Sequence, residues 1–192
     1  MPILGIMASA MSANLWQPQG AYDALSTITV GATSVSSITF AGIPNTYKHL
    51  QVRAVGQSSR GTYGNDQMTM RINGDTGSNY SAHILTGDGT GASASGVSSQ
   101  TSINLSFKLG TTVSGAFGVF IIDALDYANV SKNKTIRSLA GVDINGTIAG
   151  YGGEVQLSSG GYYSTNAINS FTFTPSNGNF TQYTQFTLYG VK

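Results

Sequence analysis

Oxygen-bearing side chains gather in the stretch RINGDTGSNY, residues 71–80, where they could coordinate a metal ion. Ca²⁺ takes roughly 6 to 8 oxygen ligands, but this stretch holds one carboxylate and lacks the acidic ladder of an EF-hand loop. The alternative is structural, because an Asn-Gly pair suits the positive φ of a tight turn after a strand. We expect a turn and no metal or cofactor. The weak calcium candidates are Asn73, Asp75, Ser78 and Asn79.

Residues suited to catalysis are sparse. His49 and His83 lie in no HxH or HExxH pattern, so we expect both to be structural. Asp123 and Asp126 offer a carboxylate pair of the kind that glycosidases use, but their spacing also suits a strand end followed by a turn. Serine is abundant, yet no GxSxG nucleophile elbow is present. We therefore expect no enzymatic activity and no catalytic residues.

Tyrosines offer a different chemistry, the stacking of aromatic rings on sugars. Tyr162 and Tyr163 fall in SSGGYYSTNA, residues 158–167, which reads as an exposed loop. Tyrosine is also frequent on sheet surfaces and in protein interfaces. These two residues are thus candidate glycan contacts, and a carbohydrate-binding module that adheres to host glycans is one functional hypothesis.

Composition narrows the classes of function. Only 9% of the 192 residues are charged, against about 25% in an average soluble domain, while apolar residues reach 40%. The chain can therefore bury a core of its own. A net charge of +1 with scattered basic residues gives no footprint for a phosphate backbone, so nucleic acid is not an expected partner. With no cysteine, disulfides and thiolate metal sites are excluded.

The N-terminal segment predicts the only helix. Apolar side chains in ILGIMASAMSANLW, residues 3–16, recur at helical spacing before a QPQG break. The segment lacks the basic start and the longer apolar core of a signal peptide, and no run approaches the ~20 apolar residues of a membrane span. It packs either on its own domain or against another subunit. We treat residues 1–20 as an anchoring arm whose expected contact residues are Ile3, Leu4, Ile6, Met7, Met11, Leu15 and Trp16.

Residues 21–192 predict one all-β domain. Short alternating runs punctuated by Gly, Asn, Ser and Pro are typical of an antiparallel β-sandwich, and their number favours a jelly-roll-like arrangement. Residues 87–100 and 158–167 are expected to be long loops. FGVFIIDAL, residues 117–125, is apolar on both alternating sets and suits a strand that is covered on both faces. The expected strands are 25–30, 35–40, 49–55, 67–73, 80–86, 101–108, 116–123, 134–143, 153–157, 168–174 and 183–191.

Several stretches together resemble a family of tailed-bacteriophage virion structural proteins. They are INGDTGSNY (72–80), IIDALDYANVSKNKTIRSLAG (121–141), SSITFAGIPNTYKHLQVRAVG (36–56) and FTLYGVK (186–192). The resemblance runs from about residue 25 to the C-terminus, and PILGIMASAM is similar to the leader of such modules. It implies a small β-sandwich that serves as a capsid decoration protein, head fibre or tail-fibre component, and it implies no enzymatic motif.

This resemblance sets the remaining expectations. The protein would lie on the virion, on the capsid or tail surface, and would pair with itself as a trimer or dimer and with major capsid or tail proteins. Host surface glycan is a further candidate partner. Lys132, Lys134 and Arg137 would be solvated or would bridge to a neighbouring subunit.

Overall fold

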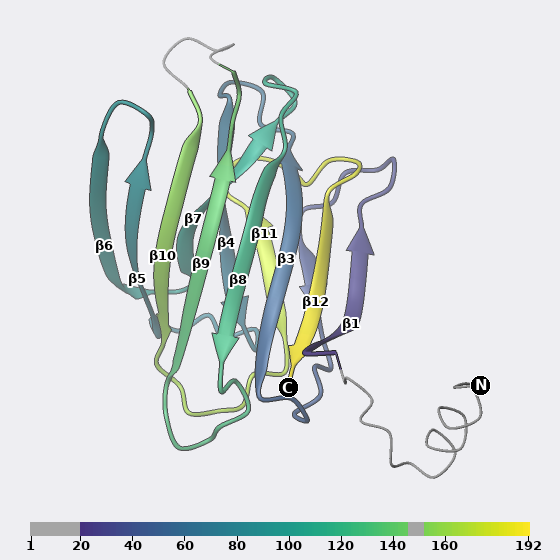
Figure 1. Ribbon diagram of the computed structural model, residues 1–192, viewed down its shortest axis with the longest axis vertical. Helices are drawn as coiled ribbons and strands as arrows, with labels where there is room; N and C mark the ends of the chain where they lie inside the picture. The colour runs from purple at the N-terminus through teal and green to yellow at the C-terminus, as the bar shows by residue number, and fades with distance from the viewer. Residues whose placement is uncertain (1–19, 146–151) are drawn as a thin grey trace, which may run out of the picture.

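The described residues form two packed layers of β-strands (Figure 1). The computed structural model describes residues 20–145 and 152–192, which contain twelve strands and no helix. Sheet A has the order β1 (Tyr22–Thr29), β12 (Gln185–Val191), β3 (His49–Ser58), β8 (Gly118–Leu125), β9 (Lys134–Val142), β10 (Glu154–Tyr162), β5 (Tyr80–Gly87) and β6 (Ala92–Gln100). Sheet B has the order β2 (Ile38–Phe40), β11 (Phe171–Pro175), β4 (Asn65–Ile72) and β7 (Ile103–Thr111).

The strand order is that of a jelly roll. The chain alternates between the layers, so that β1, β3, β8 and β12 of sheet A face β2, β4, β7 and β11 of sheet B. All pairings are antiparallel except a two-residue parallel contact between β3 and β7. Two hairpins, β5–β6 and β9–β10, widen sheet A, and β9, β10 and β5 lie against β7 of sheet B. The all-β sandwich and its jelly-roll-like arrangement are therefore confirmed.

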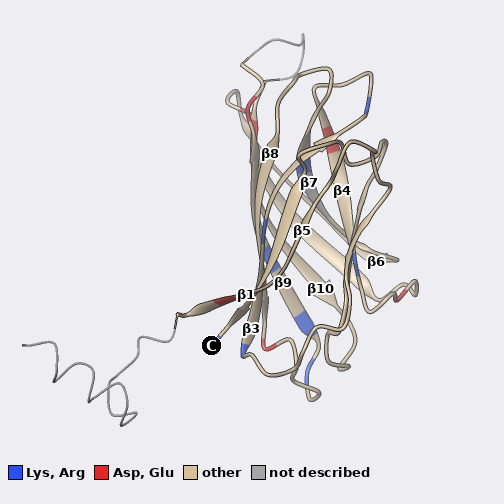
Figure 2. Cartoon of the chain, turned by 90° about the vertical axis from the view of Figure 1, so that its right-hand side faces the viewer, with Lys and Arg blue, Asp and Glu red and all other residues tan. Residues whose placement is uncertain are grey.

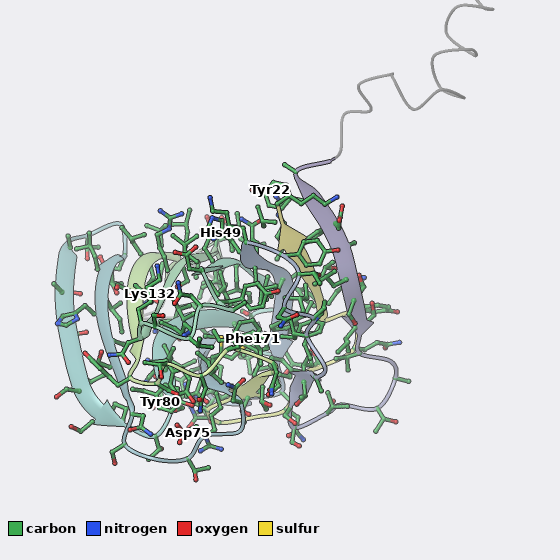
Figure 3. The ribbon with its side chains drawn as sticks, turned by 90° about the horizontal axis from the view of Figure 1, so that it is seen from below. Tyr22, His49, Asp75, Tyr80, Lys132 and Phe171 are labelled. Carbon is green, nitrogen blue, oxygen red and sulfur yellow. The ribbon has the colours of Figure 1, made fainter. Side chains whose placement is uncertain are left out.

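Aromatic rings fill the space between the layers. The ring of Phe186, on β12, lies 5.1 Å from that of Phe173 on β11 and 5.4 Å from that of Phe180. Phe120, on β8, stacks on Phe186 at 6.4 Å. These side chains are at most 2% exposed, so one cluster joins the two sheets. Figure 3 shows Phe171 of the same core between the layers.

A buried carboxylate fastens the corner where β3, β4 and the segment after β11 meet. Asp66 is fully buried and accepts hydrogen bonds from Ser58 Oγ at 2.7 Å and from Asn177 Nδ2 at 2.9 Å. The guanidinium of Arg60 lies 3.6 Å away. A buried charge is tolerated only when it is paired and hydrogen-bonded, as this one is.

The expected strands are present, with two corrections. Residues 87–100 are not one long loop, because β6 spans Ala92–Gln100 and pairs with β5. Every residue of β6 is exposed, and its Ser, Ala and Gly side chains carry no hydrophobic alternation that would have revealed it. The loop expected at 158–167 is half strand, since β10 continues to Tyr162. The expected helix and contact residues of the arm lie outside the described residues.

Candidate interaction surface

Sheet A carries a continuous apolar patch on its outer side, which faces away from sheet B. Seven large apolar side chains point outward there, each between 41% and 56% exposed. Monomeric soluble proteins rarely expose a contiguous apolar patch of more than a few hundred Å². We call this patch the apolar face. It consists of Val55, Leu85, Val119, Ile121, Leu139, Val155 and Leu157.

Strand register aligns these side chains in rows. Leu139 on β9 lies opposite Ile121 on β8 and opposite Leu157 on β10. Leu157 in turn lies opposite Leu85 on β5, so one row crosses four strands. Directly opposite side chains in a sheet are near neighbours that contact one another. A second row begins with Val55 opposite Val119.

The polarity of β10 is inverted relative to an ordinary half-buried strand. Its inward side chains Gln156 and Ser158 are buried, whereas its outward side chains Val155 and Leu157 are exposed. A strand with one solvated face normally places apolar residues inward and polar residues outward. The pattern of β10 therefore indicates that its outer side is suited to pack against a partner.

The strand covered on both faces, expected for FGVFIIDAL, is only half present. β8 is central, and its inward residues Phe120, Ile122 and Ala124 are buried. Its outward residues Val119 and Ile121 are 55% and 42% exposed. The sequence pattern predicts a cover for both faces, and the described part of the chain supplies it on one.

Charged groups at the border of the apolar face are already paired. Arg137 donates to Asp123 at 2.8 Å, and Gln51 Nε2 donates to the same carboxylate at 2.8 Å. The guanidinium of Arg53 lies 5.0 Å and 5.2 Å from the ring centres of Tyr22 and Tyr189. Charges are few and scattered over the whole domain (Figure 2). The face therefore presents little net charge to a partner.

The two candidate carboxylates, Asp123 and Asp126, each form an ion pair with a basic side chain. Asp123 lies on the outer side of β8 with Arg137, while Asp126 follows the strand and pairs with Lys132. This ammonium is the main reason why the pKa of Asp126 lies below its usual value. A glycosidase general acid needs the opposite, a raised pKa. The arrangement does not resemble that of a glycosidase.

The histidines take different places. His49 Nδ1 accepts the backbone N–H of Asp126 at 3.0 Å and lies 3.7 Å from the Asp126 carboxylate, so it supports the turn after β8. His83 is exposed on β5 beside the apolar face. No group of three or more His, Asp or Glu side chains within residues 20–145 and 152–192 is placed to hold a metal ion.

The oxygen-rich stretch at 71–80 is organised by its own hydrogen bonds. Asn73 and Gly74 have φ values of 54° and 67°, and the Asp75 N–H bonds to Ile72 O at 3.0 Å, so the expected tight turn is present. The Asp75 carboxylate accepts Gly77 N–H at 2.7 Å and Asn79 Nδ2 at 2.9 Å. The bond from Asn79 is the main reason why the pKa of Asp75 is lowered.

The side chain of Asn73 bonds to the segment before β11 rather than within its own loop. Its amide Nδ2 donates to Ala167 O at 2.8 Å, and its Oδ1 accepts Asn169 N–H at 2.8 Å. The oxygens of Asn73 and Asp75 are thus engaged in fixing the backbone. The stretch acts as a joint between β4 and the segment that leads into β11.

The hydroxyl group of Tyr80 lies against the backbone of this turn. Its hydroxyl lies 3.1 Å from Ile72 O and 3.0 Å from Asp75 O, and it accepts Ile72 N–H at 3.2 Å (Figure 3). The ring is fully buried and stacks on Tyr162 at 5.0 Å. Burial, which disfavours the phenolate, raises the pKa of Tyr80 to about 12.

Replacing Tyr80 by Phe tests this arrangement through pH. The folded protein keeps the Tyr80 proton up to about pH 12, whereas the unfolded chain loses it near its usual pKa of about 10. Stability from Tyr80 is therefore full below pH 10 and is lost between pH 10 and 12, by roughly 1 to 3 kcal/mol. We expect Tyr80→Phe to be about 1 kcal/mol less stable than wild type at pH 8, and this gap to close by pH 12.

Urea unfolding at several pH values measures this difference in stability between the wild type and Tyr80→Phe. Tyr183→Phe, at a ring that is 70% exposed, controls for loss of a hydroxyl and should change stability little. A gap that stays constant from pH 8 to pH 12 would contradict the role given to Tyr80.

The two candidate glycan contacts, Tyr162 and Tyr163, differ in their exposure to solvent. Tyr162 is 2% exposed and stacked on Tyr80, so the exposure expected of it is wrong, because β10 extends further than the loop pattern indicated. Tyr163 is 58% exposed, with its hydroxyl 3.3 Å from Ser81 Oγ. Tyr163 alone of the two can meet a ligand from solvent.

The basic residues of the 121–141 stretch also differ from expectation. Lys134 is 2% exposed rather than solvated, and its ammonium donates to three backbone carbonyl groups. Lys132 and Arg137 are more open and pair with Asp126 and Asp123 of the same chain.

Sequence comparisons name no relative. The chain matches no protein-family model and no curated protein. Within the described residues, no helix is long and apolar enough to cross a membrane.

The apolar face is not apparent from the sequence alone. Its members were assigned to strands but not to one surface, because register across five strands is not visible in a single sequence. Two features pointed to it. They are the apolar residues on both sides of β8, and the outward Val155 and Leu157 of β10 beside its inward Gln156 and Ser158.

Proposed function

We propose that the protein is a non-enzymatic structural subunit of a tailed-bacteriophage virion, a capsid decoration protein or head-fibre subunit on the particle surface. The apolar face carries this proposal. A small, weakly charged β-sandwich with an uncovered apolar sheet face is suited to assembly. The sequence stretches that resemble phage virion proteins are the reason for naming a virion as the assembly.

Its contacts would come from two apolar surfaces, the apolar face of sheet A and the arm of residues 1–20. Copies of the chain and major capsid or tail proteins are the partners that such surfaces fit. Because few charges need to be desolvated, these contacts would depend weakly on salt. The loops at the ends of the sandwich would stay free to face solvent.

A second candidate function is a tail-fibre or baseplate component, or a carbohydrate-binding module, that contacts the host surface. The exposed rings of Tyr163 and Tyr183, at 58% and 70%, favour it. Sugar-binding sites commonly present aromatic rings to solvent, and both tyrosines meet that requirement. No catalytic step is involved in either function.

Locating the protein on intact virions tests the proposal. Gold-labelled antibody against the folded domain is expected to mark particles at regular positions on the head. Label confined to the tail tip, together with glycan-array binding that Tyr163→Ala abolishes and Val130→Ala preserves, would favour the adhesion function. Absence of the protein from purified particles would overturn the structural role.

A further inference from the structure

We propose that a second copy of this chain packs its own apolar face against this one, about a two-fold axis near Leu139 and Leu157. This inference builds on the structural role proposed above and names the partner of the same surface. Two-fold pairs are the commonest assemblies of identical chains, and each copy then uses the same patch. Four arguments support the pairing: area, pattern, charge and shape.

The area suits a stable pair. The outer side from β3 to β6 is six strands wide, roughly 29 Å at ~4.8 Å spacing. Four outward positions on each strand make it roughly 26 Å long. The resulting surface is on the order of 750 Å², close to the ~800 Å² that each partner buries in a standard interface. Leu139 on β9 and Leu157 on β10 lie at its centre.

The pattern places an apolar centre inside a polar border. The apolar rows are bounded toward β12 by Arg53 and toward the lower strand ends by Asp123 and Arg137. Interfaces between copies have this form, with a more apolar core and a polar rim that keeps water access. The inverted polarity of β10 places Val155 and Leu157 outside the intramolecular core.

Charge permits an identical partner. A face that carried unpaired charges of one sign would repel its own copy, at a cost in affinity. Here the guanidinium of Arg137 is paired with the carboxylate of Asp123 at 2.8 Å, and the guanidinium of Arg53 is stacked on two tyrosine rings. Two such faces meet without bringing unpaired like charges together.

Shape permits interdigitation. Leu157 stands between two shallow grooves, one of about 530 Å³ and the other of about 280 Å³. Leu85 and Ala94 line the larger groove, and Ile121 and Leu139 line the smaller. Across a two-fold axis, Leu157 of each copy can enter a groove of the other. Sheets that pack face to face interlock their side chains in this way.

Sedimentation equilibrium of the full chain tests the pairing. We expect a dimer at micromolar concentration, and we expect Leu139→Asp with Leu157→Asp to raise its dissociation constant at least about tenfold. Val113→Asp with Val130→Asp is the matched control, since these valines are 48% and 68% exposed outside the face. The control should stay dimeric, and circular dichroism should show both variants folded.

Cross-linking tests the axis independently, because the chain has no cysteine. A Leu157→Cys chain is expected to be joined into a dimer by a bis-maleimide reagent that spans about 10 Å, since sheets packed face to face lie about 10 Å apart. Val130→Cys should cross-link much more slowly. Equal cross-linking rates would overturn the proposed axis even if the protein is a dimer.

Deleting residues 2–16 separates the second copy from the arm as the occupant. A dimer of unchanged affinity supports the pairing. A full-length monomer that becomes a dimer on deletion would show that the arm covers the face, and would overturn it. A monomer in both forms would also overturn it, and if that monomer is still found on virions, the proposed structural role survives alone.

Discussion

Phe186→Ala is expected to lower the free energy of unfolding by about 3 to 5 kcal/mol, the usual cost of removing a buried phenylalanine. The ring is fully buried on β12 and contacts three other phenylalanine rings from both layers. Its removal takes away the transfer free energy of the ring and leaves a cavity. The surrounding rings are anchored on paired strands of two sheets, so the cavity cannot easily collapse.

Urea unfolding followed by circular dichroism measures this loss. Phe186→Leu keeps most of the volume and should cost less than half as much, because the cost follows the size of the cavity. Tyr183→Ala removes a ring that is 70% exposed and should change stability by less than about 0.5 kcal/mol. If Phe186→Ala costs no more than Tyr183→Ala, the cluster does not join the sheets.

Local rules predicted the strands well where alternation was strong. In β4, Met68, Met70 and Ile72 are buried, as the alternation in QMTMRI indicates. The turn at Asn73-Gly74 followed from the positive φ that this pair favours. β6 was not predicted because its residues, mostly Ser, Ala and Gly, are all exposed and show no hydrophobic alternation, and the strand forms by backbone pairing with β5.

The candidate surface needed information that local rules do not hold. Ile121 and Leu139 are neighbours because β8 pairs with β9 in one register, and Leu85 joins them through β10, which lies far away in sequence. A shift of one residue in any of these strands would turn its outward apolar side chain inward. The burial of Tyr162 was hidden for a similar reason, since its partner Tyr80 is on another strand.

The stretch at 71–80 shows how composition can mislead. Its oxygens suggested a metal site, yet Asp75 and Asn73 use them to hold backbone N–H groups of the turn and of the segment before β11. A resemblance to phage structural proteins at this stretch therefore concerns a joint of the scaffold. The surface most suited to contact a partner lies on the opposite layer, over β8, β9, β10 and β5.

Replacement of Lys134 is also expected to lower the stability of the fold strongly. It begins β9, is 2% exposed, and its Nζ donates to the carbonyl oxygens of Asn129, Lys132 and Thr165 at 2.6, 2.8 and 3.1 Å. Burial, more than the nearby charge of Lys132, lowers its pKa. The three carbonyls satisfy all three ammonium donors, so one side chain ties the loop before β9 to the loop after β10.

Lys134→Met should therefore lower the free energy of unfolding by about 3 kcal/mol, since three hydrogen bonds from a buried charged group are lost while most of the side-chain volume is kept. Lys132→Met is the matched control two residues away. Its side chain is 53% exposed and pairs only at the surface with Asp126, so its loss should cost less than about 1 kcal/mol. Hydrogen exchange should also rise in both tied loops for Lys134→Met. Equal urea midpoints for the two variants would mean that the three carbonyls find water instead, and that the loops hold without the buried ammonium.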